Sequence, residues 1–429
     1  MKVLPAKQFT INKKVEYGSA EQNKAVQNII ETIIREKDEA LIRFTEQFDG
    51  VQSVRLKVSK QEIDAAYEHV NDEFLVALRK AAENIKVFHE KQKRNSWMDL
   101  QEDGSLLGQV MRPLNRVGIY VPGGTAAYPS SVLMNAIPAQ VAGVNEIVMV
   151  TPPSTNGEEG INPFILAAAK ELGIKEVYRV GGAQSIAALA YGTETIRPVD
   201  KICGPGNIYV ALAKREVYGV VDIDSIAGPT DITILADQSA DASYVAADLL
   251  SQAEHDEMST AILVTNSSNL ALHVQKEVET QLNVLPRKEI ASKSIEQNGV
   301  ILIVDHIEEG IKVVNELAPE HLEIMMDEPM SILGKIENAG AIFLGRYSAE
   351  PVGDYFAGPN HILPTNGTAR FSSPLNVDDF LKKSSVIYYS KNAILQNGEY
   401  IMQLARQEGF EGHARSIQIR LEKEGNLDG

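Results

Sequence analysis

The chain has 429 residues, of which 44% are hydrophobic and 23% are charged, and its formal net charge at pH 7 is −17. This length predicts at least two domains, the composition is that of a globular protein, and the negative charge disfavours nucleic-acid binding. No apolar run is long enough to cross a membrane, and the first residues lack the apolar core of a secretory signal, so we expect a cytoplasmic protein without membrane contact.

The first third of the chain contains two long amphipathic helical patterns, at 20–50 and 62–95. Between about 117 and 223, short apolar runs alternate with helical patterns, which predicts a parallel sheet covered by helices on both faces. The strands of this first sheet are expected at 117–124, 146–153, 176–182, 199–206 and 219–224.

A second series of strands is expected at 231–237, 260–266, 300–305, 321–327 and 340–345, with helical patterns again from about 374 onward. We expect the N-terminal helices to pack on this second sheet, which would make one domain discontinuous. The expected domains are an N-terminal arm (1–18), a discontinuous α/β domain (19–116 and 229–373), an inserted α/β domain (117–228) and a helical C-terminal segment (374–429).

The segment "LLSQAEHDE" carries Gln252 and His255 on a predicted helix, about 60° apart along one edge of its apolar stripe. Their spacing by itself favours the structural alternative, a surface-facing glutamine beside a partly buried histidine. Further polar groups, Asp354 and His361, lie in a Gly- and Pro-rich segment that is expected to be a loop, and zinc accepts imidazole nitrogen and carboxylate or amide oxygen. A turn-capping aspartate and a loop histidine are the structural alternatives.

Glu320 and His321 are adjacent at the start of an expected strand, and a carboxylate and an imidazole are the commonest acid–base groups near neutral pH. The alternative is an exposed pair at the boundary of an element. The only cysteine, Cys203, excludes an internal disulfide and a thiolate zinc cluster. It is expected to be a small buried strand residue, although a nucleophilic thiolate is an alternative.

Three glycine segments, "VPGG", "VGGAQ" and "CGPGN", end successive strands of the first sheet. Glycine allows close approach of the backbone to a phosphate, and the N-terminus of a following helix favours negative charge. None of the segments has the G-x-G-x-x-G spacing, so the pattern favours a nucleotide site without specifying which nucleotide.

Taken together, these motifs closely resemble the histidinol dehydrogenase family, in the same order from about residue 20 to residue 420. The resemblance rests on "YVPGG", "VGGAQSIAALAYGT", "KICGPGN", "AGPTDITILAD", "LLSQAEHD", "APEHLEI", "GDYFAGPNHILPT" and the late "EG…GH". It implies two Rossmann-like parallel-sheet domains, one of them inserted into the other, with an N-terminal arm and a helical tail.

The resemblance also implies an enzyme that uses one Zn²⁺ per subunit and two NAD to oxidise L-histidinol, through L-histidinaldehyde, to L-histidine. It implies a homodimer in which Glu408 and His413 act in the partner's site. The implied catalytic pair is Glu320 and His321. The implied zinc ligands are Gln252, His255, Asp354 and His413; the substrate-binding residues are Thr230, Gln252, His255, His321, Asp354, His361, Glu408 and His413; and the NAD-binding residues are Tyr120, Gln184 and Asn207.

One departure from the family pattern is found in "AGPTDI", where the family usually has Ser and Glu and this chain has Thr230 and Asp231. Threonine keeps the hydroxyl but adds a methyl group, and aspartate is one methylene shorter than glutamate. Two other functions are alternatives: a dehydrogenase that acts on another polar alcohol, such as a sulfonated diol, on the same scaffold, and a zinc hydrolase. His361, Glu408 and His413 favour histidinol over the first, and the glycine turns favour a dinucleotide over the second.

Overall fold

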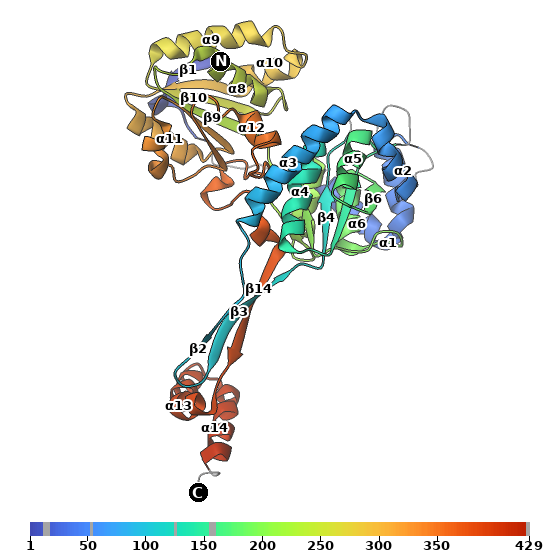
Figure 1. The fold of residues 1–429 in the computed structure, drawn as a ribbon, viewed down its shortest axis with the longest axis vertical. Coiled ribbons are helices and arrows are strands. Elements are labelled where there is room, and N and C mark those ends of the chain that lie inside the picture. The colour runs from blue at the N-terminus through green and yellow to red at the C-terminus, as the bar shows by residue number, and fades with distance from the viewer. Residues whose placement is uncertain (12–17, 52–54, 124–126, 154–159, 426–429) are drawn as a thin grey trace. The chain divides into compact units, whose positions relative to one another are not determined.

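The computed structural model describes residues 1–11, 18–51, 55–123, 127–153 and 160–425 (Figure 1). The chain divides into two compact units. The first contains Met1–Gln92 and Leu114–Phe380, and the second contains Lys93–Pro113 and Leu381–Gly429. Within the described residues, no helix is long and apolar enough to cross a membrane. Two parallel sheets form the core of the first unit, as the sequence predicts.

One of these sheets has five strands in the order β6-β5-β4-β7-β8, and all neighbouring strands are parallel. The strands are β4 (Arg116–Tyr120), β5 (Glu146–Thr151), β6 (Glu176–Arg179), β7 (Lys201–Cys203) and β8 (Asp222–Ile223). The connecting helices are α4 (Pro129–Ala142), α5 (Pro163–Glu171), α6 (Gly182–Tyr191) and α7 (Ile208–Val217). The glycine segments therefore lie just beyond the carboxyl ends of β4, β6 and β7.

The N-terminal helices α1 (Ala20–Asp49), α2 (Lys60–Ala65) and α3 (Asp72–Glu90) pack on the helices of this five-stranded sheet (Figure 1). Helix α1 contacts α6 and α7, and α3 contacts α4 and α5. We expected them on the other sheet, and that packing prediction is wrong. The amphipathic pattern identifies the apolar face of α1, but Val26, Ile29 and Ile30 complete a core cluster that includes residues of β5 and α6.

The other sheet has six parallel strands in the order β1-β11-β10-β9-β12-β13. The strands are β1 (Lys2–Pro5), β9 (Asp231–Ala236), β10 (Thr260–Thr265), β11 (Gly299–Ile303), β12 (His321–Met325) and β13 (Ala341–Leu344). The start of the expected N-terminal arm is therefore an edge strand that pairs with β11. The remainder of the arm, 12–17, lies outside the described residues.

Helices cover both faces of the six-stranded sheet. Helices α8 (Ala242–Ala253), α9 (Ser268–Leu282) and α10 (Lys288–Asn298) share one apolar cluster with inward residues of β9, and α11 (Ile307–Leu317) packs with the alternate residues. Ile234 belongs to the first cluster and Leu235 to the second, because successive residues of a strand point to opposite faces. A short helix, α12 (Glu350–Tyr355), follows β13.

The second unit is an antiparallel sheet with the order β14-β3-β2 and a pair of helices that contact each other. Its elements are β2 (Trp97–Leu100), β3 (Leu106–Pro113), β14 (Leu381–Tyr388), α13 (Lys391–Gln407) and α14 (Glu411–Gly425). The expected helical tail is present from Lys391, whereas the preceding residues form β14. Two segments far apart in sequence thus build one unit, which the helical pattern alone does not predict.

Candidate active site

The end of α8 presents the first pair of predicted site residues. Asp241 caps the helix by accepting a hydrogen bond from Ser243 N, Gln252 lies in the last turn, and His255 follows the helix. Gln252 is fully buried, and its Oε1 has no hydrogen-bond partner among the described residues. Because a buried amide oxygen without a partner is costly, Gln252 is suited to coordinate a cation or bind a ligand.

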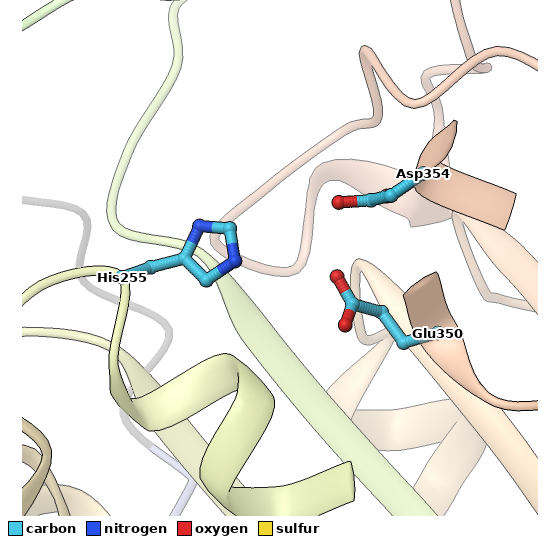
Figure 2. Close-up of side chains that lie close together, drawn as sticks. All are labelled: His255, Glu350 and Asp354. Carbon is cyan, nitrogen blue, oxygen red and sulfur yellow. The ribbon is translucent and has the colours of Figure 1, made fainter. Parts of the chain in front are cut away.

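His255, Glu350 and Asp354 form a cluster in which one ligand atom from each residue lies within 4.8 Å of the others (Figure 2). Glu350 and Asp354 are one turn apart on α12, so they share a face of this helix. Asp354 therefore lies in a helix, whereas the Gly- and Pro-rich pattern predicted a loop. Glu350 was not predicted from the sequence, although its i, i+4 spacing to Asp354 was a signal that could have identified it.

Electrostatics makes this cluster suitable for a cation. Contact with His321 and His361 lowers the pKa of Asp354 to about 2 against the opposing effect of burial. Burial and the neighbouring Asp354 carboxylate raise the pKa of Glu350 to about 8. At neutral pH without a cation, the cluster thus holds one ionised and one protonated carboxyl group, and a bound cation would favour ionisation of both.

A buried carboxyl group on β12 anchors α12. Glu323 Oε1 accepts a hydrogen bond from Glu350 N at 2.8 Å, and Ser251 Oγ donates to Glu350 Oε2 at 3.0 Å. Burial and the nearby Asp248 raise the pKa of Glu323 well above its ordinary value. The position of the cluster is therefore set from β12 and α8 together.

Thr230 connects Gln252 to Glu320. Its hydroxyl donates to Glu320 Oε2 at 2.5 Å and accepts a hydrogen bond from Gln252 Nε2. The neighbouring Asp231 holds Glu320 twice: Asp231 N donates to Glu320 Oε2 at 3.1 Å, and Asp231 Oδ1 accepts from Glu320 N at 3.0 Å. The two residues that depart from the family pattern thus both position Glu320.

His321 has a defined orientation. Its Nδ1 lies 3.1 Å from the carbonyl oxygen of Asp231, so Nδ1 carries a hydrogen and donates it, while Nε2 lies 3.6 Å from Asp354 Oδ1. Burial lowers the pKa of His321, but the Glu320 and Asp354 carboxylates outweigh it and raise the pKa to about 10. Without a cation, the imidazolium is therefore the favoured form.

A cavity of about 240 Å³ contains most of the predicted catalytic and substrate-binding residues. His361 contributes from the segment after α12, with its Nδ1 3.0 Å from the carbonyl oxygen of Asp354. Residues that follow β4 and β7, Pro122, Gly204 and Pro205, also line this cavity. The predicted site residues on its wall are Thr230, His255, Glu320, His321, Asp354 and His361.

Glu408 and His413 belong to the second unit. Glu408 caps the C-terminal end of α13, and His413 lies in the first turn of α14. Both are exposed, and the ring of His413 is 5.2 Å from that of Phe410. The structure of a single chain therefore leaves these two predicted site residues at the surface of their own unit.

A second cavity, of about 410 Å³, contains all three residues predicted to bind NAD. The hydroxyl of Tyr120 accepts a long hydrogen bond, 3.4 Å, from Gly182 N at the start of α6. Asn207 caps α7 through Oδ1, which accepts from Tyr209 N at 3.0 Å, so its Nδ2 is available as a donor. Gln184 lines the same cavity and is almost fully buried.

Glycine is required where the strand ends approach one another. Gly204 has φ +113°, and a Cβ on it would lie 2.1 Å from the carbonyl oxygen of Tyr120. A Cβ on Gly181 would lie 2.6 Å from the Cβ of Pro152. Gly124, in the "VPGG" segment, lies outside the described residues. The glycines of the first sheet therefore allow tight packing of the segments around the two cavities.

Cys203 is fully buried, and burial raises the pKa of its thiol well above the ordinary value. A thiol in this state is a poor nucleophile because little thiolate forms at neutral pH. This supports the interpretation of Cys203 as a small core residue of β7.

Comparison with known proteins agrees with this geometry. The family model for histidinol dehydrogenase matches residues 12–421. The histidinol dehydrogenase of Halalkalibacterium halodurans is 60% identical over 415 residues, which are 97% of this chain and 97% of that protein. The one from Bacillus subtilis is 56% identical with the same coverage. The crystal structure of histidinol dehydrogenase from Elizabethkingia anophelis is 41% identical, covers 99% of both chains and gives a TM-score of 0.94.

These matches define an enzyme, an oxidoreductase of amino-acid biosynthesis. The chain belongs to the histidinol dehydrogenase family, and its reactions are the final steps of histidine biosynthesis. The family and the fold expected from the sequence motifs are thus confirmed.

Proposed function

We propose that the enzyme oxidises L-histidinol, through L-histidinaldehyde, to L-histidine with two NAD and one Zn²⁺ per subunit. The observation that carries this proposal is the 240 Å³ cavity, whose lining residues include candidate metal ligands and the Glu320–His321 pair. The test is an assay of the purified protein with L-histidinol and NAD, before and after a chelator. Formation of two NADH per histidinol, lost on chelation and restored by zinc, is expected; turnover that survives complete metal removal would refute the metal requirement.

The side chains around His255 fit a zinc ion. Zinc accepts imidazole, carboxylate and amide ligands, and a catalytic site leaves one position open to the substrate. Gln252 has a buried, unpartnered Oε1, and Asp354 and His255 have ligand atoms within 4.8 Å of each other. In the proposed site, Gln252, His255 and Asp354 bind zinc together with His413 of the partner subunit. Zinc would orient the substrate through its amine and imidazole groups.

His321 and Glu320 are proposed to move the protons. Each oxidation removes a hydride and a proton from the substrate, and NAD supplies the hydride acceptor when it is bound. A cation bound to Asp354 would weaken the hold of this carboxylate on the His321 proton and favour the neutral imidazole. In that form Nε2 takes the proton from the hydroxyl of histidinol, because Nδ1 donates to the carbonyl of Asp231. Glu320 then takes a proton from the water that adds to the aldehyde, and His321 assists the second oxidation.

These separate roles can be tested by comparing the two half-reactions. His321→Asn should abolish both oxidations, whereas Glu320→Gln should spare oxidation of the alcohol more than oxidation of the aldehyde. Single-turnover measurements with histidinol and with histidinaldehyde would separate the steps. Equal loss of both half-reactions in Glu320→Gln would contradict the assignment.

The NAD site is proposed to include Tyr120, Gln184 and Asn207. All three line the 410 Å³ cavity at the carboxyl ends of the parallel strands, which is where open α/β sheets bind ligands. The N-terminal backbone of α6 lines it as well, and a helix N-terminus favours the negative charge of a pyrophosphate.

The active form is proposed to be a homodimer in which Glu408 and His413 complete the partner's site. Large apolar side chains on the second unit, each more than a third exposed, provide a surface for such an interface. They are Trp97, Met98, Leu100, Leu107, Ile387, Tyr388, Tyr389, Leu395, Tyr400, Leu404, Phe410 and Ile419.

Complementation between two inactive variants tests the exchange of His413. His255→Ala and His413→Ala should each be inactive alone. If His413 acts in the partner's site, each mixed dimer has one intact site and one doubly altered site, so co-refolding should restore about a quarter of the activity. If His413 acts within its own subunit, every site stays altered and no activity returns.

A further inference from the structure

Asp49 places a carboxyl group in the proposed NAD cavity. It is the last residue of α1 and lines the 410 Å³ cavity together with Tyr120, Gln184 and Asn207. Its Oδ2 is buried and has no hydrogen-bond partner among the residues that the structure describes. Its negative charge also contributes to raising the pKa of Tyr120, which means that the two groups are close.

The position of Asp49 is unfavourable for folding. The C-terminal end of a helix carries a partial negative charge, so a carboxylate in the last turn of α1 is disfavoured there. Burial raises the pKa of Asp49 to about 6, which shows that its surroundings oppose ionisation. A half-buried carboxylate with one buried oxygen that lacks a partner is retained at a cost in stability, which is characteristic of a residue that serves a ligand.

The residues that line the two cavities indicate which end of NAD would contact Asp49. Glu320 and His321 line the smaller cavity, where the nicotinamide must react. Among the described residues, the larger cavity shares no lining residue with the smaller one. Its lining includes apolar side chains, among them Ile29 and Phe48, that suit an adenine ring. The adenosine half is therefore assigned to the cavity that contains Asp49.

We infer that Asp49 is a specificity-determining residue whose carboxylate accepts hydrogen bonds from the adenosine ribose hydroxyls of NAD and excludes the 2′-phosphate of NADP. A ribose diol offers two donors to an acceptor-only carboxylate. No Lys, Arg or His is among the described residues that line the cavity, so a 2′-phosphate would meet a carboxylate and no cation. This inference rests on the proposed use of NAD.

The experiment compares Asp49→Asn with Glu31→Gln, which removes the same charge from an exposed position on α1 outside the cavity. Calorimetric titration without substrate gives the dissociation constants of NAD, NADP and ADP-ribose. In Asp49→Asn, binding of NAD and ADP-ribose should weaken about 10- to 100-fold, and the preference for NAD over NADP should fall by about tenfold or more. Glu31→Gln should match the unaltered protein.

Two further readouts separate this role from a structural one. The melting temperature of Asp49→Asn should equal or exceed that of the unaltered protein, since an unfavourable charge is removed; a clear decrease would overturn the inference. The unaltered protein should bind AMP about tenfold more tightly than 2′-deoxy-AMP, a comparison that needs no variant. Equal binding of the two nucleotides would also overturn it.

The outcomes distinguish this inference from the proposed function. If the unaltered protein binds neither NAD nor ADP-ribose, the proposed use of NAD fails, and the role of Asp49 fails with it. If it binds both but Asp49→Asn keeps the same affinities and the same preference over NADP, only the role of Asp49 is refuted.

Discussion

Replacement of Thr230 by valine removes one hydroxyl and preserves the shape of the side chain. The hydroxyl donates to Glu320 Oε2 at 2.5 Å and accepts from Gln252 Nε2, so the variant loses both bonds. A hydrogen bond to a charged group contributes about 1.5–3 kcal/mol, and a buried donor left without a partner costs about 1–3 kcal/mol. Because Gln252 is fully buried, Thr230→Val should lower the free energy of unfolding by about 3–5 kcal/mol.

Thr230→Ser is the matched control, since it keeps the hydroxyl and removes only the methyl group. Urea unfolding of the metal-free proteins should separate the two variants by several kcal/mol. The bond from Thr230 also lowers the pKa of Glu320, so its loss should move the acid limb of the rate profile to higher pH in Thr230→Val alone. If both variants unfold within about 1 kcal/mol of each other, the bridging role of Thr230 is refuted.

Four further results are expected. Glu350 lies beside the proposed ligands His255 and Asp354, so Glu350→Gln should weaken zinc binding about 10- to 100-fold in a chelator competition; unchanged affinity would show that Glu350 does not support the zinc site. Cys203→Ala should keep its turnover number, whereas a large loss would revive the thiolate alternative. His413→Ala should lose zinc as well as activity, by metal analysis of the purified protein. Arg116 lowers the pKa of Glu176 from 4.5 to about 2. The ion pair therefore stabilises the fold fully above pH 4.5, and this stabilisation is lost as the pH falls toward 2. Glu176→Gln should lower the free energy of unfolding in urea by about 2 kcal/mol at pH 7, and the difference between variant and unaltered protein should shrink between pH 4.5 and 2.

The sequence predicted most strands of the two parallel sheets because they are nearly continuous apolar runs that are bounded by turn-forming residues such as Gly, Pro, Ser, Asn and Asp. It did not predict where α1 packs, since an amphipathic helix reveals its buried face but not the surface that it meets. The β14–β3 pairing was also missed, because it joins segments about 270 residues apart and no local pattern encodes that contact.

Some residues of the candidate site could be predicted from the sequence and others could not. Residues in recognisable motifs, such as Glu320, His321 and Asp354, were named from the sequence and line one cavity. Glu350 and Asp49 were not, because each resembles an ordinary helical acid until the fold brings it to a cavity. Glu408 and His413 are exposed on the second unit, and their contribution to a site remains a prediction about two chains.

None of the residues that the structure describes lines both cavities, and this separation has a kinetic consequence for the proposed function. The proposed reaction consumes two NAD for each histidinol, so one cofactor must leave and another must enter while the aldehyde is held. A reactive aldehyde that diffused away would be lost to side reactions with amines. If the adenosine half of NAD binds in the larger cavity, as proposed, that half can be released and replaced outside the pocket in which the aldehyde is held, and only the nicotinamide half has to enter and leave that pocket.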